Sequence, residues 1–108
     1  MKILGKGSEE SNRGKPLIGL PDAFLCLRHG AEVERFLRDV GTPQEIRALT
    51  ERLHVAQLLW EGGHGSYRDI HEATGVSLAT ITRVARFLKI EPNKGYELVF
   101  ERVLGETK

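Results

Sequence analysis

Cysteine is almost absent from this sequence: Cys26 is the only one in 108 residues, so no disulfide can form within the chain. Long apolar runs are missing too, which excludes a membrane span and the apolar region of a signal peptide. The net charge is only +1, so nucleic acid would have to be bound through a local patch and not through a polycationic surface. These absences indicate a cytoplasmic protein with no membrane partner.

The length predicts one globular domain, because 108 residues bury a modest core to which a second subunit would add useful burial. Residues 1–20 hold few large apolar side chains and are expected to form a flexible arm ahead of a domain at residues 21–108. No segment alternates apolar and polar residues over the length of a strand, so the predicted fold class is all-α.

Two short helices are expected before residue 41. The first is capped by Asp22 and stopped by Gly30, and the second covers residues 32–40 with one apolar face. Cys26 and His29 have C-x-x-H spacing, but no second pair of ligands follows at the distance that a zinc finger needs. We therefore expect no metal and no cofactor.

The strongest local signal is Thr42-Pro43-Gln44-Glu45, in which threonine is an N-cap, proline takes the first helical position and glutamate the third. A long helix is predicted from here to the Gly62-Gly63 pair. Its apolar positions recur in steps of three and four and make a wide stripe: Ile46, Leu49, Leu53, Ala56 and Trp60, with Val55, Leu58 and Leu59 beside them. So wide a face favours burial against a second subunit, and a compact monomer core is the alternative.

Residues 66–89, SYRDIHEATGVSLATITRVARFLK, have the pattern of two short helices joined by a tight turn. Ser66 followed three residues later by Asp69 is a helix start, which predicts a first helix over residues 67–74. Gly75 then supplies the left-handed conformation that ends a helix. The pattern predicts a helix-turn-helix and makes DNA the first candidate partner.

Ser77 can cap the second helix of this pair, predicted over residues 78–89. Its buried stripe consists of Leu78, Ile81, Val84 or Ala85, and Leu88, which leaves small, polar and basic side chains on the outer face. Such a face can approach base edges and phosphates. The local charge agrees, because residues 64–90 contain four basic and two acidic residues. An ordinary helical hairpin in a core is the alternative.

A last amphipathic helix is expected after the loop at Pro92 and Asn93. Its apolar residues Tyr96, Val99, Phe100 and Val103 recur at i, i+3, i+4 and i+7. This helix brings the predicted number to six.

The stretch from Thr42-Pro43 through RALTERLHVAQLLWEG, and then SYRDIHEATGVSLATITRVARFLK, resembles the Trp repressor family. FLRDVGTPQEIRALTERL and the closing GYELVFERV are most similar to the YerC/YecD-type, TrpR-related branch. The resemblance implies a six-helix domain that forms an intertwined homodimer, with one helix-turn-helix per subunit. It also implies binding of double-stranded DNA at an operator with paired half-sites.

The resemblance also assigns roles to single residues. Arg68 matches a first-helix arginine that reaches a base, and His71 matches a DNA-facing lysine, a replacement that weakens the contact unless the imidazole is protonated. Arg86 is expected to meet phosphate. The residues expected to contact DNA are Arg68, His71, Ser77, Leu78, Ala79, Thr80, Thr82, Arg86 and Lys89.

Three further positions match the ligand site of the repressor. Arg52 and Arg83 correspond to the two arginines that sandwich tryptophan, whereas Val84 stands where the family has a glycine. We expect the branched side chain of Val84 to fill the space for the indole ring. Arg52, Arg83 and Val84 are therefore a possible effector pocket whose effector is unknown, and tryptophan is not expected as corepressor.

The features of the sequence bear on three kinds of function. The favoured one is a sequence-specific, homodimeric transcriptional regulator, expected to repress and to lie with the nucleoid in the cytoplasm. The alternative is a protein interaction module that keeps the helix-turn-helix without binding DNA, which the low net charge permits. An enzyme is not expected, because the four histidines lie on different elements with no catalytic motif around them.

Overall fold

The computed structural model describes residues 14–15 and 17–105, and every element in this part of the chain is a helix. The all-α prediction is confirmed. The chain divides into two compact units, residues 1–40 and residues 41–108, and each is described by itself. The predicted flexible arm lies mostly outside the described residues, because residues 1–13 and 16 are not among them.

The first unit contains helices α1 (Leu20–Leu25) and α2 (Gly30–Val40), and here two predicted helix ends were wrong. Asp22 is the third residue of α1 and not its cap: its Oδ2 accepts a hydrogen bond from the Gly19 N–H at 3.2 Å. Gly30 begins α2 and does not stop α1. Gly30 does not have the positive φ of a glycine that ends a helix. It is the first residue of α2.

Among its described residues, 14–15 and 17–40, the first unit has no buried side chain. Its two helices meet at Phe24 and Phe36, whose rings are 5.3 Å apart, edge to face. Leu25 is 82% exposed, and Leu20 and Val40 also face solvent. The unit therefore presents apolar side chains that its own residues do not cover.

The second unit begins with α3 (Pro43–Glu61), whose predicted capping box is confirmed. The Thr42 Oγ1 accepts from the Glu45 N–H at 3.0 Å, and the Glu45 carboxylate accepts from the Thr42 N–H at 2.9 Å. The apolar stripe is buried only in the second half of the helix. Leu49 in the first half and Leu53 at the middle of the helix are about half exposed.

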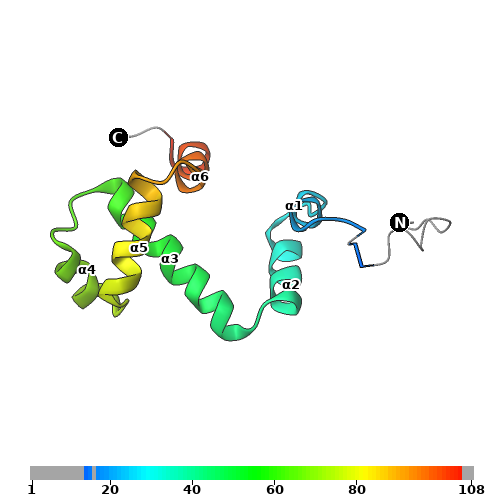
Figure 1. The fold of residues 1–108 in the computed structure, drawn as a ribbon, viewed down its shortest axis with the longest axis horizontal. Helices are drawn as coiled ribbons and strands as arrows, with labels where there is room; N and C mark the ends of the chain where they lie inside the picture. The colour runs from blue at the N-terminus through cyan, green and yellow to red at the C-terminus, as the bar shows by residue number, and fades with distance from the viewer. Residues whose placement is uncertain (1–13, 16, 106–108) are drawn as a thin grey trace. The chain divides into compact units, whose positions relative to one another are not determined.

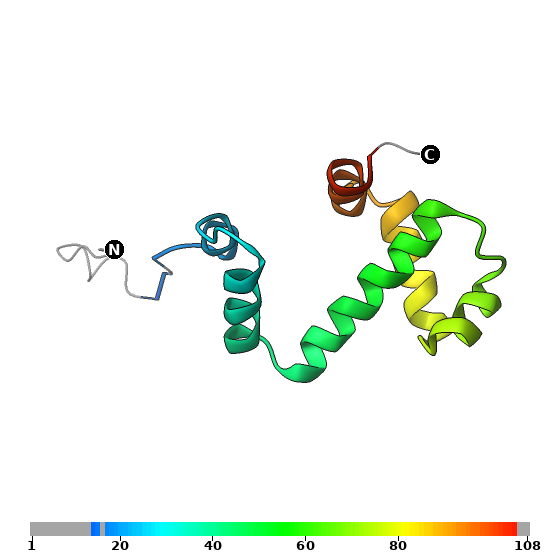
Figure 2. The ribbon, with the colours of Figure 1, turned by 180° about the vertical axis from the view of Figure 1, so that it is seen from behind.

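Three shorter helices complete the second unit: α4 (Tyr67–Thr74), α5 (Leu78–Lys89) and α6 (Gly95–Leu104). Helix α5 packs against α3, α4 and α6, and α4 lies beside the start of α5 (Figures 1 and 2). All buried side chains of the described residues belong to this unit, namely Val55, Ala56, Leu59, Ile70, Val76, Ile81, Val84, Ala85 and Phe100. The core therefore supports α5 from behind.

Among the described residues, no helix is long and apolar enough to span a membrane. No three His, Cys, Asp or Glu side chains in this part of the chain are placed to hold a metal ion.

Candidate nucleic-acid interface

Helix α4 begins with the predicted capping box. The Ser66 Oγ accepts from the Asp69 N–H at 3.1 Å, and the Asp69 Oδ2 accepts from the Ser66 N–H at 2.8 Å. These bonds, first of all the one from the Ser66 backbone, hold the pKa of Asp69 below its ordinary value. Gly65 has a φ of +84°, and a Cβ there would collide with the Asp69 carboxylate. Only glycine fits this close approach.

The turn between α4 and α5 has the predicted form. Gly75 is left-handed with a φ of +80°, and its N–H donates to the His71 carbonyl at 2.8 Å. Val76 is 4% exposed and enters the core, as an apolar plug should. Ser77 then caps α5 by accepting the Thr80 N–H at 3.2 Å. Both helices have the residue bounds that the sequence predicts.

The residues predicted to contact DNA lie around this turn and along α5. Ile81, Val84 and Ala85 are buried behind them, so the opposite side of α5 faces outward. His71 and Thr80 are half-buried, and the exposed members of the set are Arg68, Ser77, Leu78, Ala79, Thr82, Arg86 and Lys89. The exposure of most of this set leaves it accessible to a large ligand.

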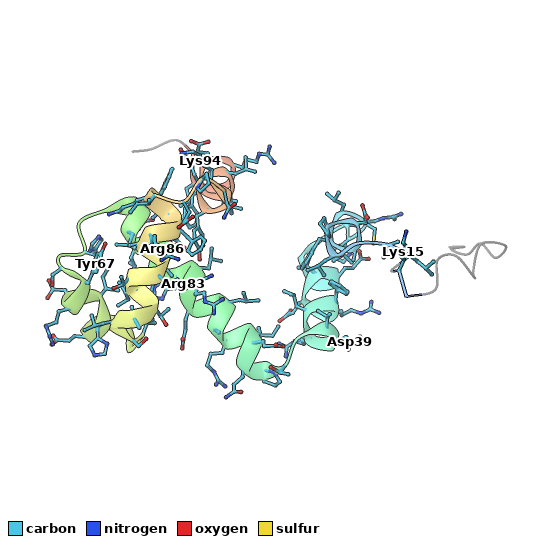
Figure 3. The ribbon with its side chains drawn as sticks, viewed as in Figure 1. Lys15, Asp39, Tyr67, Arg83, Arg86 and Lys94 are labelled. Carbon is cyan, nitrogen blue, oxygen red and sulfur yellow. The ribbon has the colours of Figure 1, made fainter. Side chains whose placement is uncertain are left out.

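Arg86 is not a free cation. Its Nε lies 3.3 Å from the Glu91 carboxylate, and its guanidinium lies 5.1 Å from the centre of the Phe87 ring. Figure 3 labels Arg86 and Arg83 along α5. Sequence reasoning missed the pair with Glu91, because the only signal was an acidic residue just beyond the helix. Since exposed ion pairs are weak, this pairing does not prevent Arg86 from exchanging Glu91 for phosphate.

Arg52, Arg83 and Val84 line one hollow of about 440 Å³ in the second unit. The remaining lining is mostly apolar and comes from α3, α5, the loop after α5 and α6: Leu49, Leu53, Phe87, Asn93, Gly95, Tyr96 and Val99. The structure thus brings together the three residues predicted as a possible effector pocket. None of the described residues that line the hollow is acidic.

Whether Val84 fills the space for an indole ring stays a prediction. Val84 is 1% exposed and belongs to the core under α5, and the hollow remains beside it. An aromatic ring of the protein itself, that of Phe87, lies against the guanidinium of Arg83. The Arg83 guanidinium lies 4.4 Å from the centre of the Phe87 ring, within the range of a cation–π contact.

The arrangement of a long capped helix, a helix-turn-helix and a closing helix agrees with a family model described as Trp repressor protein, which matches residues 16–104. The chain belongs to the Trp repressor family. Within the family it is of the YerC type, since it is 43% identical over 91 residues to the uncharacterised protein YerC of Bacillus subtilis, covering 84% of this chain and 85% of that protein. This family consists of helix-turn-helix regulators and not of enzymes.

Two solved structures share this Trp repressor fold. A TrpR-like protein from Eubacterium eligens has a TM-score of 0.73 at 40% identity, covering 92% of this chain and 99% of that one. A Staphylococcus aureus protein crystallised as a candidate Trp repressor has a TM-score of 0.75 at 36% identity, covering 95% and 100%. The six-helix, Trp-repressor-like fold predicted from the sequence is therefore confirmed.

Proposed function

We propose that this Trp repressor family member is a sequence-specific DNA-binding transcriptional regulator. The observation that carries the proposal is the exposed start of α5. Ala79 and Thr82 are small enough for the helix to approach base edges, and Arg68 and Lys89 are exposed cations of the same helix-turn-helix. The buried residues behind α5 hold it as a rigid reading element.

A homodimer is the form in which this surface would act. Supporting it are the exposed apolar side chains of the first unit and the half-exposed Leu49 and Leu53 of α3. A two-fold dimer would place two α5 helices in successive major grooves about 34 to 36 Å apart. Half-sites at that spacing would form the operator, and a DNA-bound regulator would lie with the nucleoid in the cytoplasm.

Selection of bound duplexes from a random pool tests this function. We expect a symmetric consensus with two half-sites about one helical turn apart. Enrichment should weaken as salt rises, because the bound cations release counterions from the phosphates. No enrichment at low salt would reject DNA binding and favour the interaction module, which the net charge of only +1 permits.

We also propose that the regulator represses without L-tryptophan as corepressor. The support is the Phe87 ring, which occupies a face of the Arg83 guanidinium that a ligand indole would need. Calorimetric titration with L-tryptophan, with and without the selected duplex, should detect no binding and no gain in DNA affinity. Micromolar binding would show that the hollow around Arg52 accepts the amino acid.

Repression itself is tested with a reporter gene whose promoter contains the selected operator. Its expression should fall when the protein is present.

A further inference from the structure

Val76, the residue just before the cap of α5, has both of its backbone polar groups bound by side chains of α4. The Thr74 Oγ1 accepts the Val76 N–H at 3.1 Å and itself donates to the Ile70 carbonyl at 2.7 Å. On the other side of the residue, the His71 Nδ1 lies 2.7 Å from the Val76 carbonyl oxygen. Val76 is buried, so water does not readily replace these partners.

The His71 bond determines where the imidazole carries its hydrogen. A carbonyl oxygen only accepts hydrogen bonds, so Nδ1 must be the donor. In the neutral ring Nε2 then has no hydrogen. This hydrogen placement differs from the Nε2–H form that an unconstrained histidine side chain also adopts, and it makes the neutral His71 a donor toward the turn.

The bond acts at the point where α5 starts. Fixing the Val76 carbonyl fixes the plane of the peptide that joins Val76 to Ser77, the N-cap of α5. The Ser77 Oγ and carbonyl in turn accept the N–H groups of Thr80 and Ile81. A side chain of α4 therefore orients the first turn of α5, although α4 and α5 share no helical backbone bonds.

We propose that His71 is a positioning residue, which holds the start of α5 in its DNA-binding orientation through the Nδ1–H bond to Val76. This inference rests on the proposed DNA-binding function. It assigns His71 an effect through α5, in place of the direct contact that the matching lysine of the family makes. The consequence is that loss of the bond weakens DNA binding even where no DNA atom is touched.

A matched pair of variants separates the two nitrogens. In His71→Asn the amide nitrogen takes the place of Nδ1 and can still donate to the Val76 carbonyl. In His71→Gln the amide nitrogen takes the place of Nε2, and only carbon remains at the Nδ1 position. His71→Ala removes both nitrogens and serves as the reference for complete loss.

Amide hydrogen exchange of the full chain without DNA gives the first readout. We expect His71→Gln and His71→Ala to raise exchange at Thr80 and Ile81 about fivefold, the size of one net hydrogen bond, and His71→Asn to change it less than twofold. Affinity for the selected duplex should follow the same order. Long-range proton–nitrogen NMR of the wild-type imidazole should show hydrogen on Nδ1 at neutral pH.

Three results would overturn the positioning role: a wild-type imidazole with hydrogen on Nε2 and none on Nδ1, unchanged exchange in His71→Ala, or strong DNA binding by His71→Gln with weak binding by His71→Asn. The last pattern would mean that Nε2 contacts DNA directly. The exchange and NMR measurements need no DNA, so they still decide the role of His71 if the wild type binds none.

Discussion

The two units of this chain differ in whether the apolar faces of their helices are buried. Residues 55–100 of the second unit contain every buried side chain of the described chain, gathered behind α5. Helix α2 of the first unit is just as clearly amphipathic in sequence, yet neither it nor α1 buries a side chain. An apolar face alone therefore does not make a core, because a helix buries its stripe only where a second surface covers it.

This difference separates two roles. The core of the second unit supports the surface that we propose for DNA binding. This surface therefore forms within one chain. The first unit leaves Leu25 exposed, and the homodimer that we propose would cover it. Four measurements test this division, from the largest expected effect to the smallest.

The largest effect is expected from Ile81→Ala. Ile81 lies on the buried face of α5 and is fully buried, and its truncation should lower the free energy of unfolding by about 2 to 5 kcal/mol. Ile90→Ala is the matched control, because Ile90 is 75% exposed and should change stability by less than about 0.5 kcal/mol. Urea denaturation measures both. Similar losses for the two variants would mean that the core does not end where the structure places it.

The next effect concerns the first unit. Leu25→Glu should raise the dimer dissociation constant by at least about tenfold, because each copy of a buried leucine contributes about 1.5 to 3 kcal/mol to association. Gln44→Glu adds the same charge at an exposed polar position of α3 and should leave association unchanged. Sedimentation equilibrium measures the constant. A folded wild-type monomer at micromolar concentration would reject the homodimer itself.

A third comparison uses one arginine from each unit. Arg68→Ala should weaken binding to the selected duplex by about 1 to 3 kcal/mol and relax its preference at one base pair. Arg35→Ala removes an exposed arginine of α2 and should change affinity by less than about 0.5 kcal/mol. Fluorescence anisotropy with the selected and a scrambled duplex gives both numbers. An equal loss on both duplexes for Arg68→Ala would reject base readout by this residue.

The smallest effect concerns the start of α4. Ser66→Ala should lower stability by about 1 kcal/mol at neutral pH, since it removes the cap. The lowered pKa of Asp69 gives the cap a pH dependence. Its contribution is complete above the ordinary pKa of an aspartate and is lost as pH falls through the lower folded pKa.

Protection of the first α4 amides, followed by hydrogen exchange across the acid range, measures this loss. Asp69→Asn should remove this part of the pH dependence. Asp22→Asn is the control, because Asp22 makes the corresponding bond in α1 and its substitution should leave the α4 amides unchanged. A wild type whose α4 amides keep full protection at acid pH would contradict the role of the Asp69 carboxylate.

The helix ends that the sequence predicts correctly share a local cause. Thr42 with Glu45, Ser66 with Asp69, and Ser77 each satisfy a helix start within three residues, so the pattern contains all the atoms involved. The two wrong helix ends fall in the first unit. There Gly30 carries no signal that separates a helix start from a helix stop.

The predicted site was local in the same sense. Its residues follow from the spacing on two helices, and the structure places most of them at the surface of one turn and one helix. Spacing did not reveal which of them already have partners. Arg86 pairs with Glu91, Arg83 lies over Phe87, and His71 binds the Val76 carbonyl.

The sequence by itself determined where three of the helices begin, the left-handed turn at Gly75 and the all-α class, because each depends on bonds between residues a few positions apart. Only the tertiary structure decided which half of α3 is buried and that a hollow remains beside Val84. These features depend on how α3, α5 and α6 fill the volume between them. Such packing depends on the side chains of several helices together. The apolar periodicity of one helix does not predict it.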